Sequence, residues 1–273
     1  MQKPLLRWIL AILITLSAAA YQRLTGPTYP FKGEISLDGQ SISYKLLRSH
    51  GGAGNQPVSL ALLDTSYSGY VVFKRYKVNE EWQKLPMHRT ANGLYAELPH
   101  QPPAGKLEYY ILLERGTEQV TIPAHTTVVT RFKGEVPLYV LIPHILFMFF
   151  AFLFSNLTGL EAIARGPNLA RFTFITFVLL IIGGMILGPL VQKHAFDAYW
   201  TGIPFGYDLT DNKTLIAVLG WLLALWAVRK NPDKPSTRWL VVFAAVLMLA
   251  VYLIPHSMMG SELDYNSMKV KTG

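Results

Sequence analysis

The sequence contains no cysteine. This absence excludes disulfide bonds, thiolate metal sites, cysteine nucleophiles and the covalent attachment of c-type haem. Charged residues are also scarce, at 15% of the chain, compared with roughly 25% in ordinary soluble domains. The net charge of +8 is not gathered into a run of lysines and arginines of the kind that binds nucleic acid, so we expect no nucleic-acid partner.

Apolar residues are abundant and make up 51% of the chain. They gather in one block at the start and four blocks after Val136. A helix of about 20 apolar residues crosses a hydrocarbon core about 30 Å thick, so the lipid bilayer is the predicted environment. The last four blocks predict a four-helix transmembrane bundle over residues 136–257, with spans at about 136–154, 172–191, 215–228 and 239–254.

Residues 1–24 fit two alternatives. The small residues Ala18 and Ala20, after a short apolar run, match the cleavage pattern of a secretory signal peptide. A helix from Pro4 to about Arg23 is also long enough to remain as an N-terminal membrane anchor, ending at Gly26-Pro27. We favour the anchor, and in both cases the following segment is exported.

Residues 28–135 have an ordinary soluble composition and predict an exported β domain. The pair Asp38-Gly39 lies between the alternating segments 31–37 and 40–47, which is a strong signal for a hairpin. Short, evenly spaced strands of this kind are typical of an immunoglobulin or fibronectin type III β-sandwich. The further strand segments are 58–62, 70–76, 94–98, 107–113 and 127–132.

One segment of this domain carries a family resemblance. The Pro/Gly-rich turn at 98–105 leads into the tyrosine-bearing stretch 107–111. This order resembles bacterial immunoglobulin-like modules. The resemblance implies a fold and no activity.

The connections between the apolar blocks predict the orientation. Lysine and arginine accumulate in cytoplasmic loops. The loop after the second span and the loop after the fourth are basic, whereas acids balance the bases in the loop after the third. The β domain, the loop after the third span and the tail 258–273 are therefore predicted to be periplasmic in a multi-pass protein of the bacterial inner membrane. The basic residues of the two inner loops are Arg165, Arg171, Arg229, Lys230, Lys234 and Arg238.

Three histidines fall near the predicted outer face: His144, His194 and His256. The tetrapeptide Leu-Ile-Pro-His occurs twice, at 141–144 and 253–256. Proline removes one helical hydrogen bond, so an imidazole beside it is a way to build a polar pocket between helices. The outer loop and the tail add a polar cluster of Asp197, Asp208, Asp211, Lys213, Glu262 and Asp264.

These residue types allow several cofactors. Imidazoles with carboxylates ligate transition metals, two imidazoles bind b-type haem axially, and the same groups hydrogen-bond a quinone or relay protons. Structural roles compete with each of these. An imidazole can bond a carbonyl near the proline, and Asp208, Asp211 or Asn212 can cap the following helix. The spacing fits no standard metal motif.

A second resemblance covers the bundle. Residues 200–206 and 208–213, together with His256 and 260–265 of the tail, resemble a family of bacterial inner-membrane proteins with no assigned activity. The resemblance implies a compartment and no mechanism.

Two function classes follow from the sequence, and neither names a reaction. The first is an inner-membrane subunit whose outward-facing histidine and carboxylate site serves electron, proton or metal handling in a larger complex. The second is a non-enzymatic scaffold or assembly protein whose immunoglobulin-like domain binds other membrane or periplasmic proteins.

Overall fold

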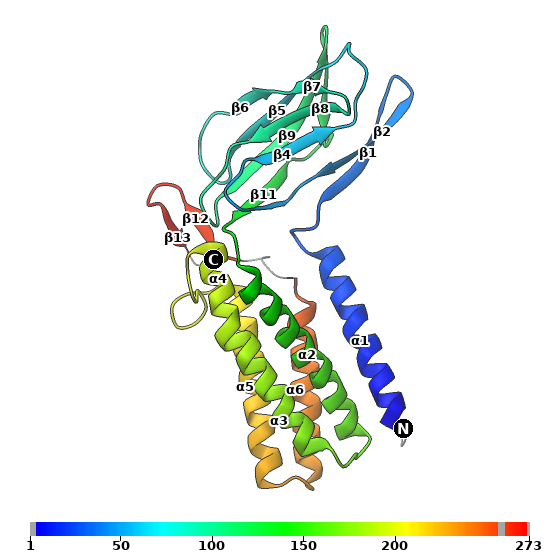
Figure 1. Ribbon diagram of the computed structural model, residues 1–273, viewed down its shortest axis with the longest axis vertical. Coiled ribbons are helices and arrows are strands. Elements are labelled where there is room, and N and C mark those ends of the chain that lie inside the picture. The colour runs from blue at the N-terminus through cyan, green and yellow to red at the C-terminus, as the bar shows by residue number, and fades with distance from the viewer. Residues whose placement is uncertain (1–3, 256–259, 272–273) are drawn as a thin grey trace. The chain divides into compact units, whose positions relative to one another are not determined.

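The computed structural model describes residues 4–255 and 260–271 (Figure 1). The chain is mixed α+β and divides into two compact units. The helical unit comprises the chain up to Pro27 and Val136–Ser261. The β-rich unit comprises Thr28–Glu135 and Glu262–Lys271.

Within the described residues, five helical stretches are long and apolar enough to cross a membrane, as the sequence predicts. The third stretch is α-helical at both ends and has a π-helical middle, and Pro189 lies in the first turn of its last part. The stretches are α1 (Pro4–Thr25), α2 (Leu138–Ile163), α3 (Leu169–Leu180) with η1 (Ile181–Leu187) and α4 (Gly188–Phe196), α5 (Leu209–Lys230) and α6 (Pro235–Leu253).

The first helix belongs to the helical unit and packs against α2 and α6. Asn156 Nδ2 of α2 donates to Thr15 Oγ1 at 3.0 Å, and both side chains are buried. Gln22 Nε2 donates to the carbonyl of Tyr252 at 2.9 Å. The sequence predicts an N-terminal anchor and a separate four-helix bundle. In the structure, all five membrane-length helices belong to one compact unit.

The core of the helical unit combines a few large aromatic residues with many small ones. Trp221 of α5 is fully buried, and the Phe152 ring stacks on Tyr252 with centroids 4.0 Å apart. A Cβ on Gly159 would lie 2.8 Å from the Cβ of Ala245, so α2 and α6 approach closely there. Small residues allow this backbone approach between apolar helices.

The β-rich unit begins with the predicted hairpin. Strands β1 (Phe31–Leu37) and β2 (Gln40–Leu46) pair antiparallel, with Leu37 opposite Gln40. Asp38 and Gly39 have φ angles of 51° and 80°. The type I′ turn of two-residue hairpins requires this left-handed backbone at both central residues, so the predicted hairpin is confirmed.

The other strands form a six-stranded and a three-stranded sheet, in the orders β3-β11-β9-β5-β6, with β10 also on β9, and β4-β8-β7. Alternate residues of β9 are fully buried in a core to which both sheets contribute. The sandwich arrangement stays a prediction. The strands are β3 (Ser49–Gly51), β4 (Gln56–Leu60), β5 (Ser68–Arg75), β6 (Gln83–Pro86), β7 (His88–Thr90), β8 (Gly93–Leu98), β9 (Lys106–Arg115), β10 (Glu118–Ile122) and β11 (Val128–Lys133).

The end of the chain returns to the β-rich unit. β12 (Glu262–Asp264) and β13 (Lys269–Lys271) form a hairpin. The amide of Lys106 donates to the Tyr265 hydroxyl at 3.0 Å, and that hydroxyl donates back to the Lys106 carbonyl at 3.0 Å. Most of the segment that the sequence division treats as a separate tail is therefore part of this unit.

Candidate functional site

The loop between α4 and α5 (197–208) is fixed to the first turn of α5. Asp208 caps this helix: its Oδ1 accepts from the amide of Thr210 at 2.8 Å, which confirms the predicted capping role. The Asp208 amide donates to the carbonyl of Thr201 at 3.1 Å. The two ends of the segment 201–208 are thus hydrogen-bonded to each other.

A second carboxylate, that of Asp211 in α5, accepts hydrogen bonds from the loop. Its Oδ2 accepts from the hydroxyl and the amide of Thr201, from the amide of Gly202 at 3.0 Å and from Gln192 Nε2 at 3.2 Å. A Cβ on Gly202 would lie 2.6 Å from the Cβ of Asp211, so the loop approaches the helix closely at a glycine. Asp211 is 6% exposed.

Ser261 joins the same site from the segment after α6. Its amide and its hydroxyl each donate to Asp208 Oδ2 at 2.9 Å. The hydroxyl also lies 3.0 Å from Thr201 Oγ1. We call the set Gln192, Thr201, Asp208, Asp211 and Ser261 the carboxylate cluster; Gln192 is half-buried and the other four are buried.

The hydrogen bonds of the cluster favour an ionised Asp208. Burial alone raises the pKa of this carboxyl. The hydrogen bonds donated by Ser261 and by the amide of Thr210 outweigh burial and hold the pKa below its ordinary value. Asp208 is therefore an anion at neutral pH whose charge is balanced by donors of the chain itself.

Lys213 lies one turn further along α5 and is also buried. Its Nζ donates to the carbonyl of Ile254 at 2.7 Å. Ile254 has left the helical conformation because it precedes Pro255, and its carbonyl is free to accept. Lys213 lines a cavity of about 40 Å³, with room for water but not for an organic substrate. The other lining residues are Met148, Leu180, Thr210, Thr214, Ala217, Met248, Val251 and Tyr252.

The three predicted histidines have different environments. His144 is partly buried, and its Nδ1 lies 3.0 Å from the carbonyl of Gly183 in η1. His194 is exposed near the end of α4, and His256 lies outside the described residues. Among residues 4–255 and 260–271, no three His, Asp or Glu side chains gather as a metal site requires. A cofactor at these histidines stays a prediction.

The predicted acidic residues divide between the two units. Asp208, Asp211 and the base Lys213 share the start of α5, whereas Asp197 is exposed and pairs with Lys193 at 2.6 Å. The other two acids belong to the β-rich unit. Glu262 pairs with Lys106 and Lys77 at 2.6 and 3.0 Å, and Asp264 pairs with Lys271.

Sequence reasoning missed Gln192, Thr201 and Ser261. Only Gln192 carries a usable signal, because a lone amide at the end of an apolar block needs a polar partner. The two hydroxyl residues look like ordinary loop residues. Their role depends on contacts between distant parts of the chain.

The cluster fixes a loop whose large apolar side chains are exposed. Asn212 Oδ1 adds a further bond by accepting from the amide of Ile203 at 2.8 Å. Ile203, Phe205 and Tyr207 are 52%, 76% and 76% exposed. We call residues 197–208 the clasped loop. The donors around Asp208 and Asp211 come from the chain itself.

Comparisons of the chain with protein families, curated proteins and solved structures found no match.

Proposed function

We propose that this chain is a multi-pass protein of the bacterial inner membrane that acts as a non-enzymatic scaffold. It holds a partner protein of the membrane or the periplasm through the clasped loop. One observation carries the proposal: buried carboxylates fix the backbone of a loop that exposes Ile203, Phe205 and Tyr207.

The physical reason lies in the cost of ordering a binding surface. A flexible loop loses conformational freedom when it binds, and this loss lowers affinity. The clasped loop is already ordered by Asp208 and Asp211. Exposed aromatic side chains on an ordered backbone are the kind of residue that dominates binding energy at protein interfaces.

The distribution of charged residues supports the membrane orientation that we propose. Arg165 lies in the α2–α3 connection, and Lys234 lies in the α5–α6 connection. Arg229 and Lys230 end α5 at that same side, and basic residues at the ends of spans remain in the cytoplasm. The α4–α5 connection then lies on the opposite side, together with the β-rich unit. The resemblance to a family of inner-membrane proteins and to immunoglobulin-like modules agrees with this placement.

Site-specific photo-crosslinking in cells tests the proposal. A photoreactive amino acid at Phe205 or Tyr207 should give a discrete protein adduct, and the same probe at Leu63, an exposed residue of the β-rich unit, should not give that adduct. Asp211→Asn should reduce the adduct several-fold, because it loosens the clasped loop without changing the probe. Adducts with lipid alone, or an adduct unaffected by Asp211→Asn, would contradict the proposal.

A second candidate is proton or ion handling, and Lys213 is the observation that favours it. Ionisable residues inside membrane helices are costly and usually functional, and Lys213 faces a water-sized cavity between helices. Optical spectra and metal analysis of the purified protein also test haem, a transition metal or a quinone at His144 and His194. A Lys213→Met variant with unchanged growth and proton permeability would remove this candidate.

A further inference from the structure

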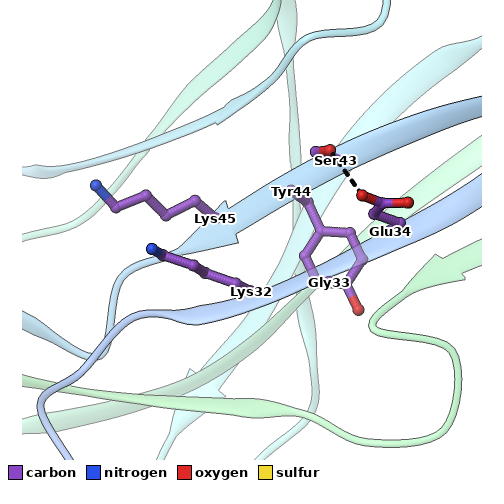
Figure 2. A pocket seen from close by; sticks show the side chains of 6 residues that line it. All are labelled: Lys32, Gly33, Glu34, Ser43, Tyr44 and Lys45. Carbon is purple, nitrogen blue, oxygen red and sulfur yellow. Dashed lines mark hydrogen bonds between the residues drawn. The ribbon is translucent and has the colours of Figure 1, made fainter. Parts of the chain in front are cut away.

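The hairpin β1–β2 places two lysines directly opposite each other. Lys32 of β1 and Lys45 of β2 are register partners, and both are exposed. Figure 2 shows the two side chains extending side by side in the same direction. Like charges opposite each other on one sheet face are destabilising, so an anion between the ammonium groups would relieve the repulsion.

The two lysines line an open concavity of about 430 Å³. Its other lining residues are Gly33, Glu34, Ser43 and Tyr44. Glu34 is turned to the hydroxyls of Ser41 and Ser43, at 2.9 and 3.5 Å, and Figure 2 shows it against Ser43, away from the lysines. Across the described parts of the chain, no carboxylate forms an ion pair with Lys32 or Lys45.

A tyrosine extends the site towards the helix that precedes the hairpin. Lys32 Nζ lies 3.3 Å from the Tyr29 hydroxyl and 5.2 Å from the centre of its ring. Tyrosine with lysine is a pair typical of the membrane–water interface, where the ring meets the headgroups and the ammonium meets their phosphates.

The length of the connecting chain limits how far the site can be from a bilayer. α1 ends at Thr25, and Lys32 follows seven residues later. Seven extended residues reach at most about 25 Å, and register partners in a hairpin lie about 5 Å apart. If α1 spans the membrane, the backbone at both lysines therefore lies no more than about 30 Å from the end of that span, which permits contact with the headgroups.

We propose that Lys32 and Lys45 bind the phosphate of an anionic phospholipid headgroup. This inference rests on the membrane placement in the proposed function and is independent of the partner at the clasped loop. The two ammonium groups donate charge-assisted hydrogen bonds to the phosphate oxygens, and the Tyr29 hydroxyl lies beside the ammonium group of Lys32. The short connection to α1 favours a lipid phosphate over a free phosphate ion.

The first experiment uses the unmodified full-length chain in nanodiscs of phosphatidylcholine or of phosphatidylcholine with phosphatidylglycerol at 1:1. A water-soluble acetylating reagent modifies exposed lysines, and mass spectrometry gives the rate at each. We expect at least threefold slower modification of Lys32 and Lys45 in the anionic nanodiscs. Lys74 and Lys84 on the β5–β6 pair serve as controls and should be unchanged. Equal rates at Lys32 and Lys45 in the two lipids overturn the proposal.

Inorganic phosphate added to the phosphatidylcholine nanodiscs distinguishes the two sources of phosphate. Protection of Lys32 and Lys45 by millimolar phosphate, equal to that by the anionic lipid, overturns the lipid assignment. Absence of such protection supports it. In the Asp211→Asn variant, anionic lipid should still protect Lys32 and Lys45 from acetylation. The lipid proposal and the scaffold proposal can therefore fail independently of each other.

The second experiment counts retained phosphatidylglycerol by native mass spectrometry. The double variant Lys32→Gln, Lys45→Gln should retain at least threefold less of this lipid than the wild type. The matched variant Lys74→Gln, Lys84→Gln loses the same charge elsewhere and should retain as much as the wild type. Equal loss in the two variants overturns a local site. If the first double variant does not fold, the protection experiment on the wild type decides the proposal.

Discussion

Arg7 of α1 and Glu161 of α2 form a buried ion pair, with Arg7 Nε 3.1 Å from Glu161 Oε2 and side chains 5% and 1% exposed. Glu161 Oε1 also accepts from the amide of Asn168 at 2.8 Å. A Cβ on Gly166 would lie 2.1 Å from the same oxygen, so the turn after α2 closes on this carboxylate through a glycine. The first helix is thereby tied by charge to the end of the second.

Removing one member of this pair should destabilise the helical unit. Glu161→Gln leaves the Arg7 guanidinium buried without a counter-charge, which costs about 3 kcal/mol by analogy with buried pairs elsewhere. We expect a lower unfolding temperature in detergent. The double variant Arg7→Met, Glu161→Gln should recover much of the loss, because neither charge remains and the amide oxygen introduced at position 161 can still accept from Asn168. Arg171→Gln, at an exposed position of α3, is the matched control, and a similar loss in that variant would contradict the explanation.

The packing of α1 also predicts that this helix remains in the mature protein. The buried bond from Asn156 to Thr15 would be lost on cleavage after Ala20, and Gln22, which donates to the Tyr252 carbonyl, would be left as the second residue of the chain without the helix that positions it. The intact mass of protein purified through a C-terminal tag should therefore include residues 4–25. A mass that begins after Ala20 would instead identify the segment as a signal peptide.

The strands show which local signals predict structure. Asp38-Gly39 predicts its hairpin correctly because the turn chemistry is contained in two adjacent residues. The strands β3, β6 and β7 are missed, because three or four residues are too few for alternation to emerge. β10 is also missed, although Arg115-Gly116 marks the turn before it.

The helix bounds show that a hydropathy pattern misses the first turns of a helix when they contain charged residues. The predicted fourth span begins at 215, whereas α5 begins at Leu209. Asp211 and Lys213 interrupt the apolar pattern, and their burial depends on partners elsewhere in the chain. Asp208 could be predicted as a cap. The bond from Ser261 could not, because it joins the residue before α5 to the segment after α6, which are far apart in the sequence.

The repeated Leu-Ile-Pro-His sequence shows a further limit. Pro143 lies inside α2, which continues through it to Ile163. Pro255 follows the end of α6, and the carbonyl of Ile254 before it accepts from Lys213. The sequence Leu-Ile-Pro therefore has different local structures in its two copies, because neighbouring helices decide whether the bonds lost at proline are replaced.

Weakening the carboxylate cluster should release the clasped loop. Asp211→Ala leaves the buried amides of Thr201 and Gly202 without an acceptor, at a cost of about 1–3 kcal/mol for a buried unsatisfied group. We expect protease cleavage between 197 and 208 to accelerate at least tenfold. Asp197→Ala, at an exposed carboxylate of the same loop, should change the rate little. Equal acceleration in the two variants would show that Asp211 has no special role in holding the loop.

Acid should loosen the tail hairpin β12–β13 in the β-rich unit. The hydrogen bond from Lys271, with that from the amide of Asn266, lowers the pKa of Asp264 to about 2. An ordinary unfolded Asp has a pKa of about 3.9. Because the folded pKa is the lower one, this carboxylate stabilises the hairpin fully above about pH 4, and the contribution disappears as the pH falls towards about 2.

Glu262, at the start of the hairpin, should also make the hairpin less stable in acid. Burial raises its pKa, but the hydrogen bonds from Lys106 and Lys77 outweigh burial and lower it below the ordinary value. Its contribution is therefore also present above the unfolded pKa and lost in acid. Lys106→Met removes one of these donors and should shift the loss of order to higher pH.

A spin label reports this transition cleanly, because the chain has no other cysteine to react. A label at Lys269→Cys should be ordered at pH 7 and become mobile between pH 4 and pH 2. In an Asp264→Asn background the label should already be more mobile at pH 7. A label at Thr117→Cys in the β9–β10 turn controls for general acid unfolding. Mobility at position 269 that stays constant down to pH 2 would contradict a role for the two carboxylates, since both are then protonated in the unfolded chain.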